Sequence, residues 1–403
     1  MTEWTPLLRD FIQQHLSDDT SSLLLSARKY PDIDVPFAAS QIESRKRLMV
    51  KLPEWYANAE LIMGGRIPCE QCSSEQTARY KQCIIAGAES MCDMTGGMGV
   101  DLYYMSEGMK EVIYTERQEQ LCRNAEHNFH AMGRQIEVRQ GDGRNMPIPS
   151  VDVIYLDPAR RAQDGSRVYA IEDCEPNVIE WQDELLSHAK TLLVKLSPMV
   201  DITDALRKLK CVSEVHVVGV KNECKEILVK CSSDKDDNDT VTFHCIDFLS
   251  NRTMHYHFTK ELAAEQIVIA SDWCEKAADE RQHYLYEPDV TLMKSHAFSN
   301  VCRDYDVQQL DFDTRLMTSD ALILDFPGRI FSIDEIIPFS SKVLKRLKSR
   351  IPKANVAVRN FPLTVDELCK RTGIKDGGDV YLFGAKVRAA GNVLFKCSKV
   401  ISI

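Results

Sequence analysis

The chain has 403 residues, of which 44% are hydrophobic, and its formal net charge is −10. This composition is that of a globular protein and excludes disordered and fibrous classes, while the length predicts two to four domains. Because neither a secretory signal pattern nor an apolar run long enough to span a bilayer occurs, we expect a cytoplasmic protein that does not associate with a membrane.

Helical spacing of apolar residues opens the chain at Leu8, Phe11 and Ile12, so we expect an N-terminal helical region over residues 1–75. The next segment, residues 76–235, alternates strand-like and helical patterns. That alternation predicts an α/β domain built on a mostly parallel sheet. Its strands are expected near residues 90–94, 111–116, 136–139, 151–156, 191–196, 213–220 and 226–231.

The remaining chain divides into three further segments. Residues 236–279 are predicted to be a connecting hairpin or linker, because a polar run precedes two strand-like runs. Residues 280–327 predict a small mixed module with a helix that begins near Asp289. Residues 328–403 predict the order strand, helix, strand, helix and two final strands.

A glycine-rich loop, residues 93–101, follows the first predicted strand and reads Asp-Met-Thr-Gly-Gly-Met-Gly-Val-Asp. Glycine lets the backbone adopt positive φ and approach a ligand closely. Glu116 ends the second predicted strand, where a carboxylate can accept hydrogen bonds from ribose hydroxyls. Together these features are typical of a nucleoside-binding βαβ unit.

The glycine spacing bears on which nucleoside is bound. A dinucleotide fingerprint that starts at Gly97 has its second glycine at Gly99, but its third glycine position is Leu102. Asp93 and Asp101 add negative charge beside the loop, which repels a pyrophosphate and suits a cation. S-adenosylmethionine carries a sulfonium and an ammonium group, so the sequence favours it over NAD. An NAD-dependent oxidoreductase stays the less favoured alternative.

Two further strand ends carry polar residues. Asp142 and Gly143 follow the third strand, where an acid can accept from the adenine amine, and residues 157–161 follow the fourth. All these residues lie at the carboxyl ends of predicted strands, where open α/β sheets bind ligands. The predicted cofactor residues are therefore Asp93, Thr95, Gly96, Gly97, Gly99, Asp101, Glu116, Arg117, Asp142 and Gly143.

In this arrangement the chain resembles class I S-adenosylmethionine-dependent methyltransferases, and within them a bacterial subgroup with a ferredoxin-like segment and a C-terminal THUMP-like domain. The matching stretches are Glu70–Glu75, Asp93–Asp101, Asp157–Arg161, Lys195–Met199 and Asn222–Glu226. The resemblance implies an α/β, Rossmann-like, seven-stranded sheet over 76–235, a ferredoxin-like module over 280–327 and a THUMP-like domain over 328–403. It also implies S-adenosyl-L-methionine as the cofactor, and it places Thr77 and Lys81 near that cofactor.

The same resemblance bears on the acceptor. THUMP-type domains accompany RNA-modifying enzymes, so we expect an RNA methyltransferase, with tRNA as a candidate substrate and no obligate protein partner. A methyltransferase that acts on a protein or a small metabolite is the alternative.

The stretch after the fourth strand lies where amino-group methyltransferases hold the target base. Their motif is Asp/Asn-Pro-Pro-aromatic, whereas here Ala159 replaces the second proline and Arg160 the aromatic residue. We predict Asp157, Pro158 and Arg160 as catalytic-face residues. Arg160 and Arg161 either contact a base or phosphate of the substrate, or pair with nearby acids.

Two other residues near this face leave alternatives open. Cys174 is the nearby candidate for the cysteine nucleophile of a C5-pyrimidine mechanism, but it lacks the local motif of those enzymes. Lys195 ends the fifth strand at the same edge, so it either reaches the substrate cleft or pairs with a buried carboxylate. The turn over residues 222–226 suggests no mechanism.

Charge is distributed unevenly along the chain. From Gly328 onward there are fifteen Lys or Arg and six Asp or Glu, a net charge of +9, so the preceding residues carry −19. A basic terminal segment on an acidic body suggests a polyanion-binding domain. We predict Arg346, Lys348 and Arg350 as contacts to RNA; the alternative is that they form the solvated face of an amphipathic helix.

No metal site is predicted. Cys69 and Cys72 form a lone C-x-x-C without the second pair of a zinc ribbon, and the scattered cysteines are typical of reduced thiols. His255 and His257 alternate on one face of a predicted strand, but the sequence shows no third ligand beside them.

Overall fold

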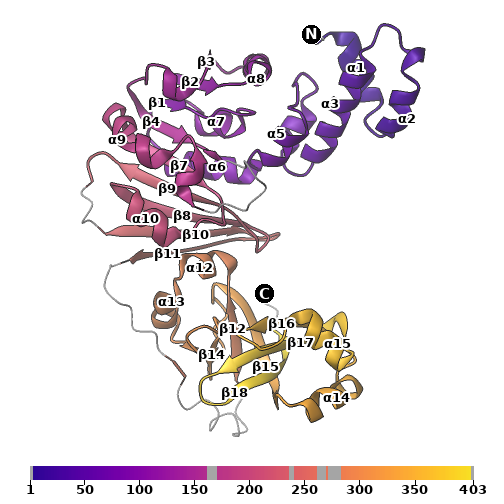
Figure 1. Ribbon diagram of the computed structural model, residues 1–403, viewed down its shortest axis with the longest axis vertical. Coiled ribbons are helices and arrows are strands. Elements are labelled where there is room, and N and C mark those ends of the chain that lie inside the picture. The colour runs from indigo at the N-terminus through magenta and orange to yellow at the C-terminus, as the bar shows by residue number, and fades with distance from the viewer. Residues whose placement is uncertain (1–2, 161–169, 236–239, 261–268, 271–282, 401–403) are drawn as a thin grey trace. The chain divides into compact units, whose positions relative to one another are not determined.

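The computed structural model describes residues 3–160, 170–235, 240–260, 269–270 and 283–400 (Figure 1). The chain forms two compact units, residues 1–215 with 226–239 and residues 216–225 with 240–403. Over the described residues, no helix combines the length and the apolar character that crossing a membrane requires. The predicted α/β fold is confirmed.

The predicted N-terminal helices are present, and short polar residues start several of them. Thr5, Asp19, Asp34 and Ser74 each accept a hydrogen bond from a backbone N–H in the first turn of the helix that follows. The helices pack through apolar side chains such as Phe11. The elements are α1 (Pro6–Gln14), α2 (Thr20–Leu25), η1 (Ala27–Lys29), α3 (Val35–Leu48), α4 (Pro53–Ala57), α5 (Arg66–Gln71) and α6 (Glu75–Ile84).

All seven strands predicted for the α/β domain are present. Those that end at the ligand edge are β1 (Ser90–Asp93), β2 (Glu111–Glu116), β3 (Glu137–Gln140) and β4 (Val151–Leu156). They pair in parallel, whereas β9 runs antiparallel to β7. The rest are β7 (Ala189–Leu196), β8 (Val212–Val220) and β9 (Cys224–Ser232).

The hairpin predicted within residues 236–279 extends this sheet. Strands β10 (Val241–Phe248) and β11 (Thr253–Lys260) pair in antiparallel fashion. In the described residues the sheet therefore has nine strands, in the order β11-β10-β8-β9-β7-β4-β1-β2-β3. A small separate pair is formed by β5 (Ala159–Arg160) and β6 (Cys174–Glu175).

Apolar side chains explain why β1 and β4 lie centrally. Met91, Cys92, Ile154 and Leu156 are fully buried, as expected for parallel strands that are covered on both faces. Because parallel strands end at the same edge, the polar residues that follow them come together there. The intervening helices are α7 (Val100–Met105), α8 (Glu119–Ala131), η2 (Gly143–Asn145), η3 (Ile171–Asp173), α9 (Val178–His188) and α10 (Ile202–Lys208).

The second unit contains a seven-stranded sheet of order β13-β14-β12-β15-β18-β17-β16 among the described residues. Both predicted C-terminal modules contribute strands to it, since β12 pairs with β15. Asp289 caps the helix predicted near it. The strands are β12 (Tyr284–Pro288), β13 (Gln308–Gln309), β14 (Met317–Ser319), β15 (Gly328–Pro338), β16 (Lys353–Arg359), β17 (Lys375–Val387) and β18 (Gly391–Lys399); the helices are α12 (Val290–Ser295), α13 (Phe298–Tyr305), α14 (Ser341–Arg350) and α15 (Val365–Thr372).

The turn that suggested no mechanism has a structural role in this unit. Asn222 adopts a φ of +60°, and its backbone N–H donates to Asp247 at 2.7 Å. Its side-chain oxygen accepts from the backbone N–H of Val290 at 3.2 Å, at the start of α12. The turn therefore holds the first turn of that helix.

Candidate active site

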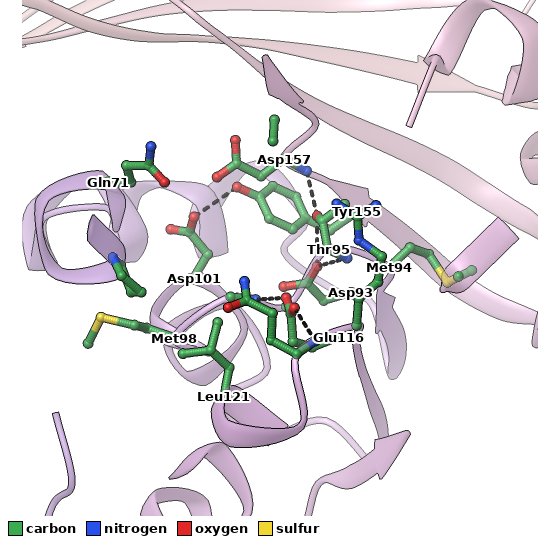
Figure 2. Close-up of a pocket in the computed structure, with 18 of the residues that line it drawn as sticks. Gln71, Asp93, Met94, Thr95, Met98, Asp101, Glu116, Leu121, Tyr155 and Asp157 are labelled. Atoms are coloured by element: carbon green, nitrogen blue, oxygen red, sulfur yellow. Dashed lines mark hydrogen bonds between the residues drawn. The ribbon is translucent and has the colours of Figure 1, made fainter. Parts of the chain in front are cut away.

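A pocket of about 470 Å³ lies at the carboxyl ends of β1, β2 and β4 (Figure 2). Asp157 and Ala159, which follow β4, line it, and Trp181 adds an apolar wall. The structure also brings all ten predicted cofactor residues to this pocket, from separate stretches of the chain: Asp93, Thr95, Gly96, Gly97, Gly99, Asp101, Glu116, Arg117, Asp142 and Gly143.

Two glycines of the loop are required by close packing. A Cβ atom on Gly96 would lie 2.2 Å from the ring of Tyr114, which real contacts do not allow. Gly99 has a φ of +77°, and a Cβ there would lie 2.5 Å from the ring of Phe129. The backbone of the loop thus lies directly on the side chains of β2 and α8, which leaves the space above it open.

Glu116 is held in place by the backbone on both sides of the pocket floor. One carboxylate oxygen accepts from the N–H of Gly97 at 3.0 Å, and the other accepts from the N–H of Gln118 at 2.8 Å. Each oxygen can accept further hydrogen bonds. The carboxylate is therefore fixed in position and still able to bind a ligand's hydroxyl groups (Figure 2).

Asp93 is buried at the end of β1, with 2% of its surface exposed. It accepts from the backbone N–H of Thr95 at 2.8 Å, and the Thr95 hydroxyl in turn accepts from the backbone N–H of Asp157 at 2.7 Å. Burial raises the pKa of Asp93 to about 8, and the charges of Asp101 and Asp157 act in the same direction. Asp93 is consequently protonated at neutral pH until a positive charge arrives beside it.

Asp101 also borders the pocket, but other side chains engage its carboxylate. One oxygen accepts from Ser73 and from Tyr155, each at 2.8 Å, and the other lies 3.1 Å from the Lys81 ammonium. Burial opposes ionisation of this carboxyl, yet Lys81 and Lys195 outweigh it and hold the pKa of Asp101 below its usual range. Asp101 thus anchors the pocket wall as a permanent anion.

Lys81 does not reach the pocket. Its side chain is fully buried, and its ammonium also lies 2.6 Å from the carboxylate of Glu226 on β9. Tyr155 and Glu226 are supporting residues that the sequence motifs did not indicate. A charged residue inside an apolar strand pattern, as Glu226 is, was the available signal.

Lys195 pairs with carboxylates, which is one of the two alternatives that the sequence left open. Its ammonium lies 2.5 Å from Asp157 and 3.6 Å from Asp101, and its side chain is 12% exposed. Burial alone would lower the pKa of Lys195, but the two carboxylates raise it above its ordinary value. Lys195 is therefore the buried partner of Asp157 rather than a residue that lines the pocket.

Charge in the pocket lining is mostly negative. Arg117 and Arg144 line the pocket together with six acids, which are Asp93, Asp101, Glu116, Asp142, Asp157 and Glu175. Arg117 is paired with Glu175 at 2.9 Å. Such a lining suits a cationic ligand and disfavours a pyrophosphate.

The crystal structure of a putative methyltransferase from Porphyromonas gingivalis W83 shares 33% sequence identity with this chain, with a TM-score of 0.84 over 98% of each chain. The chain belongs to the class I S-adenosylmethionine-dependent methyltransferases. Family models of a ferredoxin-like domain and of a THUMP-like domain match residues 284–327 and 328–399 of this methyltransferase.

Other solved structures are more distant. The crystal structure of a putative class I S-adenosylmethionine-dependent methyltransferase from Listeria monocytogenes is 12% identical to this chain. Its TM-score is 0.38 over 61% of this chain and 94% of its own. An RNA methyltransferase from Salinibacter ruber in complex with S-adenosyl-L-homocysteine is also 12% identical, with a TM-score of 0.30 over 42% and 97%. No curated protein matches the sequence.

The predicted catalytic stretch of the methyltransferase is described in part. Pro158 is buried, and the backbone of Arg160 pairs with Cys174 between β5 and β6. Arg161 lies outside the described residues. Cys174 is 7% exposed and is not among the residues that line the pocket, so its position does not favour a nucleophilic role.

The predicted RNA-contact residues lie on α14 of the THUMP-like domain. Arg346, Lys348 and Arg350 are exposed, while Leu344 and Leu347 face the core. Arg350 donates to both oxygens of Glu335, at 2.5 and 2.7 Å. The helix therefore has the amphipathic form that the sequence predicted, and one of its cations is neutralised.

Proposed function

We propose that this methyltransferase binds S-adenosylmethionine in the pocket above loop 93–101 and methylates RNA. The observation that carries the cofactor proposal is the lining of six acidic side chains, of which Asp93 ionises when a cation binds, against two guanidinium groups. The residues fit the cofactor, because a Cβ atom on Gly97 would approach nothing closer than 3.8 Å, which leaves room for a ligand over the loop, and because Glu116 presents fixed acceptor oxygens. When bound, S-adenosylmethionine supplies an electrophilic methyl group on a positively charged sulfur.

Each pocket residue has a proposed role. Glu116 binds the ribose hydroxyls, Asp142 binds the adenine amine, and Asp93 balances the ligand's positive charge. Asp157 accepts a hydrogen bond from the acceptor nitrogen and so orients its lone pair toward the methyl group. Lys195 and the Thr95 hydroxyl hold Asp157 in place for that purpose.

Removal of the Glu116 carboxylate is the direct test of the cofactor site. Glu116→Ala should weaken S-adenosylmethionine binding about 10- to 100-fold, since charge-assisted hydrogen bonds contribute about 1.5–3 kcal/mol. Isothermal calorimetry measures this affinity. Glu111→Ala, at the exposed opposite end of β2, is the matched control and should bind normally. Equal affinities of the Glu116 variant and the wild type would remove the ribose assignment.

Cofactor binding should also depend on pH through Asp93. Below its raised pKa of about 8, Asp93 must lose a proton when the cation binds, so affinity should rise with pH by up to about tenfold per unit. Measurements below about pH 7 keep the ligand's own ammonium charged. Calorimetry in buffers of different ionisation enthalpy should show release of nearly one proton. Asp93→Asn should bind without proton release, and a pH-independent wild type would contradict the assignment.

Charge on the THUMP-like domain supports RNA as the acceptor. Residues from Gly328 onward carry +9. Lys345, Arg346 and Lys348 on α14 are exposed, as are Lys370 and Arg371 on α15. The two helices share one apolar core, so these cations belong to one helical layer of the domain. A layer of this kind suits phosphate contacts.

RNA binding is tested with the full chain. A variant with Lys345→Glu, Arg346→Glu and Lys348→Glu should bind total tRNA at least about tenfold more weakly, with a shallower salt dependence because fewer phosphates are neutralised. Fluorescence anisotropy at several salt concentrations measures both. The matched control reverses three exposed cations elsewhere, Arg28, Lys29 and Lys110.

The acceptor itself is identified by turnover. Transfer of a labelled methyl group to bulk RNA, with mass spectrometry of RNA nucleosides from a deletion strain, should reveal the modified nucleotide. Labelling of a protein or small-metabolite fraction in place of RNA would overturn the acceptor and leave the cofactor proposal standing.

A further inference from the structure

Histidines gather on three adjoining strands of the nine-stranded sheet. His216 lies on β8, His244 on β10, and His255 and His257 on β11, with β10 between the other two strands. His244 stands opposite His257 in the β10–β11 register. The rings of His216 and His244 stack, with centroids 4.6 Å apart and an interplanar angle of 9°. Neighbouring strands therefore place two further histidines beside His255 and His257.

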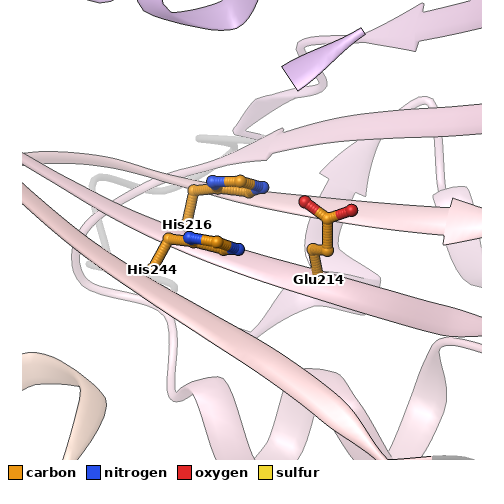
Figure 3. Close-up of side chains that lie close together, drawn as sticks. All are labelled: Glu214, His216 and His244. Carbon is orange, nitrogen blue, oxygen red and sulfur yellow. The ribbon is translucent and has the colours of Figure 1, made fainter. Parts of the chain in front are cut away.

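A carboxylate completes this group. Glu214 precedes His216 by two residues on β8, so both side chains lie on the same face of the sheet. Glu214, His216 and His244 each present one ligand atom, and these atoms lie within 4.8 Å of one another. Figure 3 shows both imidazole rings extending toward the Glu214 carboxylate. His216 is only 3% exposed, while Glu214 and His244 are half-buried, so the group is partly enclosed by the protein and opens to solvent on one side.

We propose that Glu214, His216 and His244 bind one divalent transition-metal ion, which by the chemistry of its ligands is zinc. Two imidazoles and one carboxylate are an established zinc ligand set with a fourth position left for water. Tetrahedral ligands at about 2.0–2.1 Å from the ion lie about 3.3 Å apart, so modest side-chain rotation closes the present spacing. The bound ion connects the side chains of β8 and β10.

The surroundings of His244 fit such a role. Its Nδ1 atom lies 3.4 Å from Nε2 of His255. Metal-bound histidines usually hold their second ring nitrogen in a hydrogen bond, which fixes the tautomer and the ring orientation. Nε2 of His244 is then the coordinating atom, and His255 is its positioning partner.

Lys230 competes with the metal ion for the Glu214 carboxylate. Its ammonium lies 2.7 Å from one oxygen of Glu214. The incoming cation must take the other oxygen or displace the ammonium, so Lys230 sets an upper limit on the affinity. Removal of this positive charge should therefore strengthen metal binding, an effect that a merely structural role of Glu214 would not produce.

The test uses the full-length protein, stripped with a chelator and titrated with zinc chloride in a calorimeter at neutral pH. One equivalent should bind. Glu214→Gln and His244→Gln should each weaken binding at least about tenfold, and His255→Gln about tenfold, in line with the effect of losing a supporting partner. Lys230→Met should bind severalfold more tightly. His130→Gln, an exposed histidine on α8, is the matched control and should bind as the wild type does.

Cobalt titration separates this site from binding at thiols such as Cys69 and Cys72. Cobalt with nitrogen and oxygen ligands gives weak visible bands, whereas cobalt–thiolate gives intense near-ultraviolet absorption. The proposal is overturned if no stoichiometric zinc binding occurs, if Glu214→Gln and His244→Gln bind as the wild type does, or if the thiolate band accompanies the tight equivalent.

Discussion

Replacing Lys81 with methionine is expected to lower the free energy of unfolding by about 3–5 kcal/mol, the usual cost of removing one partner from a buried ion pair. Lys81 is fully buried and lies 3.1 Å from Asp101 and 2.6 Å from Glu226. Without its ammonium, these two carboxylates would stay buried with too little positive charge. The other nearby cation, Lys195, lies 3.6 Å from Asp101 and already pairs with Asp157. Urea denaturation followed by circular dichroism measures the change.

Two further variants make this prediction specific. Lys110→Met removes an exposed partner of Glu89, and such surface pairs contribute about 0–1 kcal/mol, so its effect should be small. Adding Glu226→Gln to Lys81→Met removes one of the stranded charges and should recover part of the lost stability. A loss for Lys81→Met no larger than that of the surface control would mean that the buried network does not stabilise the fold.

Substitution of Gly96 by alanine is expected to abolish measurable S-adenosylmethionine binding, a loss of at least about 100-fold or ~2.7 kcal/mol. The new Cβ would lie 2.2 Å from the Tyr114 ring, so either the ring or the loop must move. The Tyr114 hydroxyl donates to the carbonyl of Gly97 at 2.6 Å, and the N–H of Gly97 donates to Glu116. Any shift therefore reaches the proposed ribose site. Calorimetry measures the affinity.

Gly65 provides the matched control for this substitution. It caps α5 with a φ of −66°, and a Cβ atom there would meet nothing within 4 Å. Gly65→Ala should accordingly bind the cofactor as the wild type does. If Gly96→Ala also bound with unchanged affinity while remaining folded, the loop would not form the cofactor cradle, and the proposed binding mode would have to be abandoned.

Most of the fold could be predicted from patterns among residues that are close in the sequence. Apolar strands, glycines and strand-end acids are read from neighbouring residues, and the carboxyl ends of parallel strands share one edge whatever the details of packing. For that reason the positions of Glu116 and Asp142 in the pocket followed from the chain order alone. The predicted domain boundaries, and the roles assigned to the site residues, stay predictions.

The remaining features of the site depend on contacts between residues that are far apart in the sequence, and sequence patterns do not show such contacts. The role of Lys195 was left open because its partner, Asp157, is 38 residues away in sequence. Nor could spacing show that Asp101 is engaged by Lys81 or that Arg350 is engaged by Glu335. Whether a charged side chain is used for ligand binding or for internal pairing depends on which strand or helix lies beside it.

The sequence by itself determined the α/β class, the glycine cradle and the row of acids at the sheet edge, because each depends on backbone geometry within a few residues. Only the tertiary structure decided which of these charges are neutralised within the protein and which histidines lie beside one another. The physical reason is that pairing energies depend on distance and burial, and both are set by strands that come from distant parts of the chain.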